Sequence, residues 1–250
     1  MKPIYRILGA GEWGIAVGHH LARQDHQVEI YGGSSEKFNN FKKNRLLEKL
    51  NLTIHENVTR IDDLSTLREI DEDCINIIST SSDGFSDLIQ KQKEYIKLFQ
   101  SVVWLTKGLD KNSGDLLDVI ITREIREDMH LCLISGPSFA IDLVNKIPQK
   151  VSIAATDSSL LTIIKNSMET DHFKLISTED LIGVEVSGIV KNVSAILAGI
   201  MSSLNYSPKN IDQLIILSQE EVKNLTYAIY SERGLTAPSE KIAKTINSPS

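Results

Sequence analysis

Cysteine, proline and basic residues are scarce in this sequence. Among 250 residues there are 2 cysteines and 6 prolines, and 27 lysines and arginines stand against 33 aspartates and glutamates, for a formal net charge of −6. Cys74 and Cys132 each lie inside an apolar run, which argues against a disulfide framework or a metal pair and favours two buried thiols. The acidic balance leaves no basic stripe that could track a phosphate backbone, so we expect no nucleic-acid partner.

The chain also lacks the usual signals of export and membrane insertion. Residues Met1–Leu8 contain no long apolar core after a basic start. We expect no segment that reaches the ~18 apolar residues needed to span a bilayer. These features predict a cytoplasmic protein without a membrane span. With 41% hydrophobic and 24% charged residues, the composition is that of a folded globular protein.

Short apolar runs alternate with helix-patterned stretches over the first two thirds of the chain. The runs have the length and β-branched content of strands, and apolar residues recur at helical spacing between them. The predicted strands are Ile4–Leu8, Gln27–Tyr31, Asn57–Ile61, Cys74–Ser79, Ser101–Leu105, Leu131–Ile134, Val151–Ala155 and Phe173–Ile176. The predicted helices between them are Gly14–Gln24, Phe85–Gln100 and Asp115–Ile125. Such alternation predicts an α/β fold with a doubly wound, mainly parallel sheet.

The pattern changes near Asp180, where the strand signals stop. Gly183–Met201 reads as one nearly all-apolar helix, a kind that is normally buried on several sides, and Asn210–Tyr230 reads as a second helix. We therefore predict a larger domain over residues 1–180 and a smaller all-α domain over residues 181–250. The last residues, rich in serine, threonine and proline, are expected to fray.

A glycine-rich turn follows the first predicted strand and opens the first predicted helix. The sequence I-L-G-A-G-E-W-G spans Ile7–Gly14. In this context Gly9 permits a tight turn, Gly11 lets a pyrophosphate approach the backbone, and Gly14 lets the helix pack close to the strand. The motif predicts that residues 1–180 form a Rossmann-type dinucleotide-binding domain. A glycine-rich turn without a ligand is the alternative.

The residue that would hold the adenosine ribose should come about 20 positions later, at the end of the second strand. There the sequence V-E-I-Y-G-G-S-S ends without a carboxylate, because Glu29 lies between two apolar residues and is expected to face away. Ser34, Ser35 and Lys37 are candidate contacts for a 2′-phosphate. The sequence therefore leaves both NAD and NADP open as the coenzyme.

Two loops that follow predicted strands carry polar residues. Lys107, in T-K-G after V-V-W-L, and the segment S-G-P-S-F-A at Ser135–Ala140 would both lie at the carboxyl ends of parallel strands. Ligands bind at that edge in sheets of this type. Pro137 and Ser138 are suited to start a helix. A solvated lysine and a plain strand-to-helix turn are the alternatives.

Lys191 stands in the middle of the apolar stretch V-S-G-I-V-K-N-V-S-A-I-L. A buried ammonium is costly unless it is paired, lines a polar cavity or takes part in function. Gly188, Asn192 and Ala195 flank it on the helix and leave room for a ligand. A lysine that reaches the surface along its aliphatic stem is the structural alternative.

Together these motifs resemble the NAD(P)-dependent glycerol-3-phosphate dehydrogenases of the bacterial type. Four motifs match in order over roughly the first 200 residues: G-A-G-E-W-G, W-L-T-K-G-L, I-S-G-P-S-F-A and D-L-I-G-V-E-V-S-G-I-V-K-N-V. The resemblance implies that Lys191 is the general acid/base and Lys107 a second active-site lysine. It implies coenzyme contacts at Gly9, Gly11, Glu12, Trp13, Gly14, Ser34, Lys107 and Ala140. It implies substrate contacts at Lys107, Gly136, Ser138, Lys191 and Asn192.

The C-terminal part departs from the pattern of that family. The lysine helix of the family is usually followed by an Asn-x-Arg segment whose arginine helps to hold coenzyme and substrate phosphate, and here Lys209 and Ile211 stand at those positions. The later G-D-L segment with an assisting aspartate is not found, and the helical domain is abbreviated. Asp142 and Ser81 are minor departures. Without the arginine we expect weakened phosphate binding, with Lys209 as the nearest substitute and partial recovery in Ile211→Arg.

The resemblance implies an oxidoreductase of glycerophospholipid metabolism that needs no metal. It would transfer a hydride between NAD(P)H and dihydroxyacetone phosphate to give sn-glycerol 3-phosphate. An abbreviated helical domain would leave apolar surface for a homodimer to cover. One alternative is a non-catalytic or weakly active dinucleotide-binding homologue, and another is an enzyme for a keto substrate without a phosphate.

Overall fold

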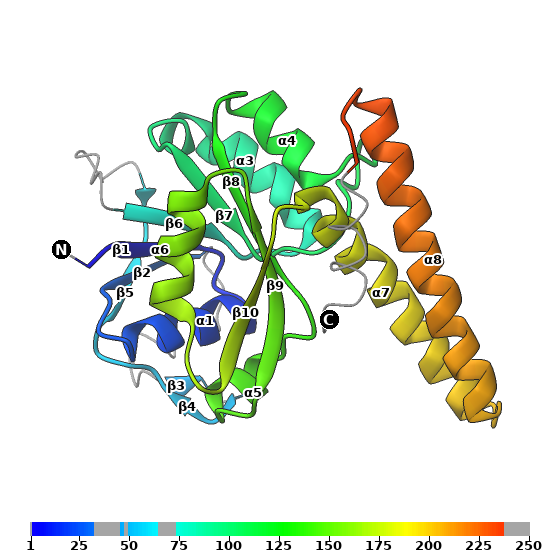
Figure 1. The fold of residues 1–250 in the computed structure, drawn as a ribbon. Helices are drawn as coiled ribbons and strands as arrows, with labels where there is room; N and C mark the ends of the chain where they lie inside the picture. Colours follow the sequence, from blue (N-terminus) through cyan, green and yellow to red (C-terminus); the bar gives the residue numbers. More distant parts are fainter. Residues whose placement is uncertain (1, 33–45, 48–49, 65–73, 238–250) are drawn as a thin grey trace.

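The computed structural model describes residues 2–32, 46–47, 50–64 and 74–237. In this part of the chain eight strands form one sheet in the order β10-β9-β8-β7-β6-β1-β2-β5 (Figure 1). They are β1 (Ile4–Leu8), β2 (Val28–Tyr31), β5 (Val58–Ile61), β6 (Cys74–Ile78), β7 (Ser101–Trp104), β8 (His130–Ser135), β9 (Gln149–Ala155) and β10 (Phe173–Thr178). Two short strands, β3 (Leu46–Leu47) and β4 (Leu52–Thr53), pair separately. All eight strands predicted from the sequence are present, with ends within two residues.

Neighbouring strands of the large sheet run parallel except at one pair. β8 and β9 are antiparallel, with Ser135 opposite Ser152, whereas the other neighbours are parallel. The prediction of a doubly wound, mainly parallel sheet is therefore confirmed. The reversal also brings the first residues of β9 to the edge at which β1, β6, β7 and β8 end.

Helices cover both faces of this sheet (Figure 1). One face packs against α1 (Glu12–Ala22), α5 (Ala140–Val144) and α6 (Ser158–Met168). The other packs against α3 (Ser82–Ile96), α4 (Leu117–Glu124) and the start of α7 (Leu181–Ser203). Because the strands are buried on both sides, their sequences read as nearly continuous apolar runs.

Helix α6 is missing from the predicted helices, although its sequence carries the signals of one. The Asp157 side chain accepts a hydrogen bond of 2.7 Å from the Leu160 N–H and caps the helix. Leu160, Ile164 and Met168 are buried at helical spacing. The segment between β9 and β10 is therefore a covering helix of the first face and not a loop.

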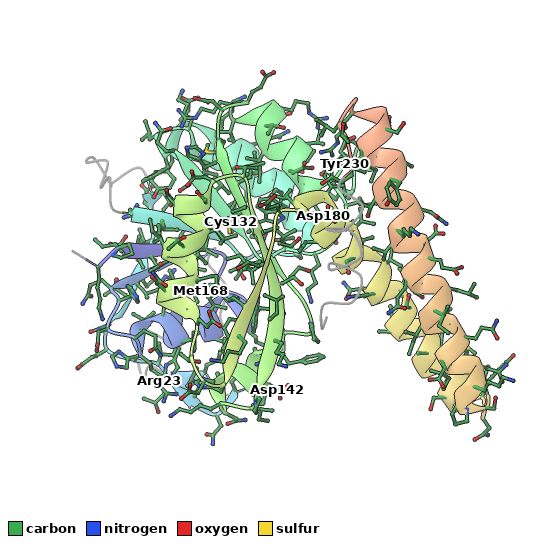
Figure 2. The ribbon with its side chains drawn as sticks, in the orientation of Figure 1. Arg23, Cys132, Asp142, Met168, Asp180 and Tyr230 are labelled. Atoms are coloured by element: carbon green, nitrogen blue, oxygen red, sulfur yellow. The ribbon has the colours of Figure 1, made fainter. Side chains whose placement is uncertain are left out.

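Helices α7 and α8 (Pro208–Glu232) form an antiparallel hairpin that extends away from the sheet (Figures 1 and 2). Each helix begins at a side-chain cap. Asp180 accepts a hydrogen bond of 2.8 Å from the Gly183 N–H, and Ser207 caps α8, whose first residue is Pro208. The two helices predicted near Gly183–Met201 and Asn210–Tyr230 are thus present and slightly longer.

The predicted burial of the α7 helix holds only for its first two turns. Residues 181–187 are buried, whereas Val193 and Ile196 are 56% and 66% exposed. The expectation of a helix buried on several sides is therefore wrong for its second half. The second half is exposed because α7 extends beyond the sheet. Among the described residues, this half then packs mainly against α8 (Figure 1).

By length and composition α7 is apolar enough to cross a membrane, which corrects the expectation that no such segment exists. Core helices of globular proteins can be equally long and apolar. In α7, 33% of the most apolar 18-residue stretch is buried inside the protein. Its first turns pack against β8 and β9, and its middle carries a lysine. We therefore assign α7 to the protein core and hairpin and not to a bilayer.

Three interior side chains agree with the sequence interpretation. Cys74 and Cys132 are buried free thiols, and burial raises the pKa of Cys132 to about 12. Glu29 does not point toward the end of β2, because its Oε2 accepts a hydrogen bond of 2.7 Å from Nε of Arg6 on β1. None of these three side chains lines the pocket at the carboxyl edge of the sheet.

Candidate active site

The glycine-rich turn joins β1 to α1 at the carboxyl edge of the sheet. Gly9 has a φ of +132°, and a Cβ on it would lie 2.2 Å from the carbonyl oxygen of Ser79. A Cβ on Gly14 would lie 2.3 Å from the Gly9 carbonyl oxygen, whereas no atom lies within 4 Å of a Cβ on Gly11. The turn and the helix packing therefore require Gly9 and Gly14. Gly11 leaves open space at the N-terminus of α1, where backbone N–H groups favour an anion.

Contacts between loops join this turn to the neighbouring strand ends. The turn itself packs on the residue that follows β6. After β7, Thr106 Oγ1 donates a hydrogen bond of 2.9 Å to the Thr80 carbonyl oxygen. The next residue, Lys107, donates one of 2.5 Å from Nζ to the carbonyl oxygen of Gly136, after β8. A continuous row of loops therefore runs from β1 through β6 and β7 to β8.

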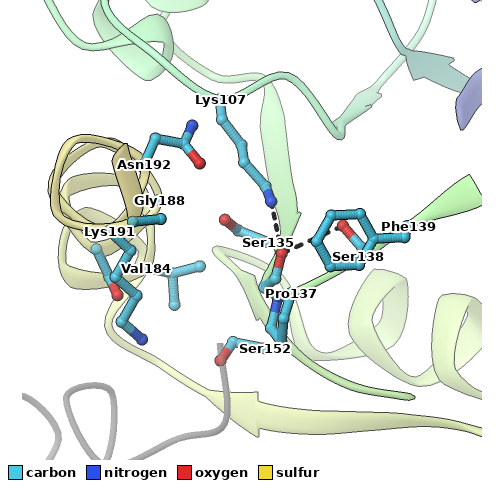
Figure 3. A pocket seen from close by; sticks show the side chains of 13 residues that line it. Lys107, Ser135, Pro137, Ser138, Phe139, Ser152, Val184, Gly188, Lys191 and Asn192 are labelled. Carbon is cyan, nitrogen blue, oxygen red and sulfur yellow. Dashed lines mark hydrogen bonds between the residues drawn. The ribbon is translucent and has the colours of Figure 1, made fainter. Parts of the chain in front are cut away.

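At the β8 end of this row a pocket of about 200 Å³ lies between the sheet and α7 (Figure 3). The residues that line it are Lys107, Ser135, Gly136, Pro137, Ser138, Phe139, Ser152, Val184, Ser187, Gly188, Lys191, Asn192 and Ala195. Two of these lining residues are cationic and none is acidic, so the pocket suits an anion. Its volume is below the ~300–1,000 Å³ of sites for drug-sized ligands, which indicates a compact metabolite.

Lys107 and Lys191 line the pocket from two different elements, and the Lys191 side chain extends toward Ser152 (Figure 3). Lys107 comes from the loop after β7, and Lys191 from α7, just beyond its buried start. Burial and, secondly, the positive charge of Lys107 lower the pKa of Lys191 to about 8. Burial also lowers the pKa of Lys107. An amine with a pKa near 8 can both give and take a proton close to neutral pH.

Gly188 keeps the pocket open beside Lys191. A Cβ at this position would lie 2.7 Å from Ser135 Oγ and 3.7 Å from Cγ of Lys107. Asn192 lies on the Lys107 side of the pocket (Figure 3). The space predicted around Lys191 from its small and amide neighbours is therefore present.

Buried polar contacts anchor the start of α7 and so fix where the helix presents its lysine. Glu185 Oε1 accepts a hydrogen bond of 2.6 Å from the Leu117 N–H of α4. Tyr230, near the end of α8, donates a hydrogen bond of 3.0 Å to Asp180 Oδ1. Burial and then the charge of Asp118 raise the pKa of Glu185 well above its usual value. These contacts join α4, α7 and α8 beneath the pocket.

The remaining predicted coenzyme residues lie near the glycine turn or outside the described part of the chain. Glu12 and Trp13 form the first turn of α1, and Ala140 is the first residue of α5. Trp13 and Ala140 both pack against the core on the α1 face of the sheet. Outside the described residues lie Ser34, Ser35 and Lys37.

Lys209 and Ile211 do not line the pocket. They lie in the first turn of α8, at the distal end of the hairpin. Ser194 Oγ donates a hydrogen bond of 2.6 Å to Ser218 Oγ, which shows the level at which the two helices pair. Counting residues from that level separates Ile211 from Lys191 by roughly 15 Å along the hairpin. The expectation that Lys209 substitutes for a phosphate-binding arginine is therefore wrong.

Two polar residues of the pocket escaped the sequence interpretation. Ser187 stands four residues before Lys191, and this helical spacing places both on one face, so a search along that face could have found it. Ser152 reaches the pocket because β9 pairs antiparallel with β8. No local sequence pattern predicts that β9 runs antiparallel to β8.

Two family models match this chain. The model described as NAD-dependent glycerol-3-phosphate dehydrogenase N-terminus matches residues 5–161. The model described as NAD-dependent glycerol-3-phosphate dehydrogenase C-terminus matches residues 180–246. Together they cover the glycine turn, both pocket lysines and the hairpin.

Relatives and solved structures agree with these matches. The glycerol-3-phosphate dehydrogenase (NAD(P)+) of Francisella tularensis subsp. novicida is 32% identical over 226 residues, which cover 90% of this chain and 68% of the relative. The glycerol-3-phosphate dehydrogenase (NAD(P)+) of Thioalkalivibrio sulfidiphilus is 28% identical over 236 residues, which cover 93% of this chain and 70% of the relative. The glycerol-3-phosphate dehydrogenase structure from Coxiella burnetii superposes with a TM-score of 0.86 at 26% identity, over 98% of this chain and 73% of that chain.

Proposed function

This chain belongs to the NAD-dependent glycerol-3-phosphate dehydrogenase family, and we propose that it reduces dihydroxyacetone phosphate to sn-glycerol 3-phosphate with NADH or NADPH. One structural observation carries the proposal. Lys107 and Lys191 converge on a pocket for a small anion, at the end of a row of loops that begins at the glycine turn. A coenzyme position and a proton donor for a phosphorylated ketone therefore lie at one edge of the sheet.

The glycine turn fits a dinucleotide coenzyme. The open space beside Gly11 and the N–H groups at the start of α1 suit a pyrophosphate. When bound, the coenzyme supplies the hydride, and both NAD and NADP fit the proposal. The residues that we assign to it are Gly9, Gly11, Glu12, Trp13, Gly14, Ser34, Lys107 and Ala140.

Lys191 holds the proton that the reduction consumes. Its ammonium donates this proton to the oxygen on C2 of the substrate as the ketone becomes an alcohol, and its neutral amine accepts the proton in the reverse direction. The pKa of about 8 suits both tasks. Lys107 adds a second fixed positive charge beside the developing alkoxide. The other substrate contacts that we assign are Gly136, Ser138 and Asn192.

We also propose that residues 1–180 form the coenzyme domain and residues 181–250 the helical domain of a cytoplasmic homodimer. The support for a dimer is the exposed apolar surface of the hairpin, where Ile196 and Ile200 are 66% and 50% exposed. Sedimentation equilibrium measures the oligomeric state directly. A monomer at all concentrations would contradict this part of the proposal.

The activity is tested by the fall of NADH or NADPH absorbance with and without dihydroxyacetone phosphate. Lys191→Ala should lower kcat by ~10²–10⁴, the usual contribution of one acid/base group, and leave coenzyme affinity nearly unchanged. Lys91→Ala is a matched control, because Lys91 is an exposed lysine of α3 far from the pocket in sequence and fold.

The same measurements separate the proposal from its main rival. If the wild type binds coenzyme calorimetrically but does not oxidise it with any ketone, the chain is a non-catalytic dinucleotide-binding homologue. If Lys191→Ala keeps the wild-type rate and only melts at a lower temperature, Lys191 is a structural lysine.

A further inference from the structure

The loop that carries Lys107 lies along the start of α3. The residue before it, Thr106, bonds to the carbonyl oxygen of Thr80, just ahead of that helix. The residue after it, Gly108, has a φ of +127°, and a Cβ there would lie 2.8 Å from Cβ of Ser82. Both neighbours of Lys107 therefore face α3, whereas Lys107 itself extends into the pocket (Figure 3).

Asp110 makes a third contact between this loop and α3. It is 4% exposed, and its Oδ1 accepts a hydrogen bond from Oγ of Ser86 on α3. Its Oδ2 accepts bonds of 3.1 and 2.8 Å from the N–H groups of Asn112 and Ser113, and one of 3.0 Å from Ser113 Oγ. The bond from Ser86, and then those from the loop, lower the pKa of Asp110 to about 2. The group is therefore a carboxylate near neutral pH.

The backbone of Asp110 closes the same loop. Its N–H donates a hydrogen bond of 2.9 Å to the Asp115 carbonyl oxygen, and its own carbonyl oxygen accepts one of 2.9 Å from the Gly114 N–H. Residues 110–115 thus form a compact turn, which the Ser86–Asp110 bond attaches to α3. A buried charge is costly unless its hydrogen bonds are made, so this carboxylate favours a single loop conformation.

That conformation determines where the Lys107 side chain starts. Lys107 Nζ reaches the Gly136 carbonyl oxygen and the pocket along a flexible stem, from a backbone position three residues before Asp110. Misplacing a catalytic group by about 1 Å can lower a rate by up to ~100-fold. Asp110 itself does not line the pocket, so any effect on the reaction has to pass through its neighbours.

We propose that Asp110 is a positioning residue, which holds the loop after β7 on α3 and thereby fixes the Lys107 ammonium at the pocket. This inference rests on the proposed function for the reaction that Lys107 serves. Ser86 is the partner on α3 through which Asp110 acts.

The test measures kcat/KM for dihydroxyacetone phosphate in three variants. Asp110→Ala removes every contact of the carboxylate and should lower kcat/KM by ~10-fold or more. Ser86→Ala removes only the bond to α3 and should give a smaller loss. Asp110→Asn should stay within about threefold of the wild type, because its amide oxygen can accept from the loop N–H groups while its NH2 group donates to Ser86. Asp87→Ala, at an exposed aspartate of α3 next to Ser86, is the matched control and should leave the rate unchanged.

A double-mutant cycle with Lys107→Met separates positioning from general stability. If Asp110 acts through Lys107, Asp110→Ala should change kcat/KM by less than about twofold once Lys107 is methionine. Equal losses in both backgrounds, or a wild-type rate in Asp110→Ala, would overturn the proposal. Thermal melting shows which variants are folded, and Ser86→Ala enters the same cycle if Asp110→Ala is not.

Crystal structures of the wild type, Asp110→Ala and Ser86→Ala give a readout that needs no turnover. We expect Lys107 Nζ to bond to the Gly136 carbonyl oxygen in the wild type and to be displaced by about 1 Å or more in the variants. This displacement in a protein without activity would contradict the proposed function and still support the positioning role. An unmoved Lys107 in the variants would overturn the positioning role even in an active enzyme.

Discussion

Lys107 Nζ and the carbonyl oxygen of Gly136 lie 2.5 Å apart, and this hydrogen bond joins the loops after β7 and β8 at the mouth of the pocket. The bond holds the side chain of Lys107 where its charge acts on Lys191, whose pKa it helps to lower. The two lysines are therefore linked electrostatically, because the charge of Lys107 adds to the effect of burial in lowering the pKa of Lys191.

Replacing Lys107 with methionine should move the alkaline limb of the pH–rate profile to higher pH. Reduction needs protonated Lys191, so the wild-type rate should fall as pH rises through about 8. Lys107→Met removes a repelling charge, and the pKa of Lys191 rises. Burial, the larger cause of the shift, still keeps this pKa below 10.5. The kcat/KM measured across neutral and alkaline pH checks this, and an unmoved limb would contradict the electrostatic link.

Gly11→Val should abolish coenzyme binding and leave the fold intact. No atom lies within 4 Å of a Cβ at Gly11, so the free energy of unfolding should change by less than about 1 kcal/mol. The added side chain occupies the space that we assign to the pyrophosphate. Gly14→Val is the contrast, because its Cβ meets the Gly9 carbonyl oxygen at 2.3 Å and should destabilise the protein. Calorimetric titration of NADH and NADPH, with thermal melting of each variant, separates the two effects.

Ile211→Arg should not improve phosphate-substrate binding in this chain. Motif comparison alone favours recovery, because an arginine is usual at this position of the family. The structure places Ile211 roughly 15 Å from the level of Lys191 along the hairpin, beyond the reach of an arginine side chain. We expect KM for dihydroxyacetone phosphate to stay within about twofold of the wild type. A tenfold fall in KM would show that the distal hairpin approaches the pocket.

Acid should destabilise the protein through two buried histidines of α1. Burial lowers the pKa of His19 and of His20 to about 4, from 6.5. The folded pKa lies below the unfolded one, so this stability is fully present above pH 6.5 and is lost as pH falls toward 4. Each histidine contributes up to about 3 kcal/mol to the loss. Urea unfolding at both ends of this window measures it.

His20→Gln should remove about half of that pH dependence. Its amide can keep a donor toward the Met168 carbonyl oxygen, 2.7 Å from His20 Nε2. His130→Gln, an exposed position at the start of β8, is the control and should leave the pH dependence unchanged. An unaltered slope in His20→Gln would assign the acid sensitivity to other groups.

The sequence predicts the parts of the site that depend on local pattern. The glycine turn between a strand and a helix can be predicted because the turn itself leaves no room for a side chain at Gly9 or Gly14. Lys107 is found because it follows a buried strand directly, and Lys191 because a lysine stands out in an apolar helix. Each signal lies within a few residues of the side chain that it identifies.

The parts that sequence patterns miss depend on how distant elements pair. Ser152 enters the pocket through the antiparallel register of β9, and a reversed strand reads like a parallel one. The distance of Ile211 from the pocket depends on the level at which α7 and α8 pair. The exposure of Ile196 depends on where α7 leaves the sheet, which no periodicity within the helix reports.

The position of α7 in the chain also sets the order in which the two halves of the candidate active site are synthesised. Every strand of the large sheet precedes Leu181 in the chain, so the platform for the coenzyme can emerge and fold before α7 exists. The lysine on α7 follows later in the chain, on a helix whose first turns pack against β8 and β9. The strands that carry the glycine turn therefore precede, in the chain, the helix that carries Lys191.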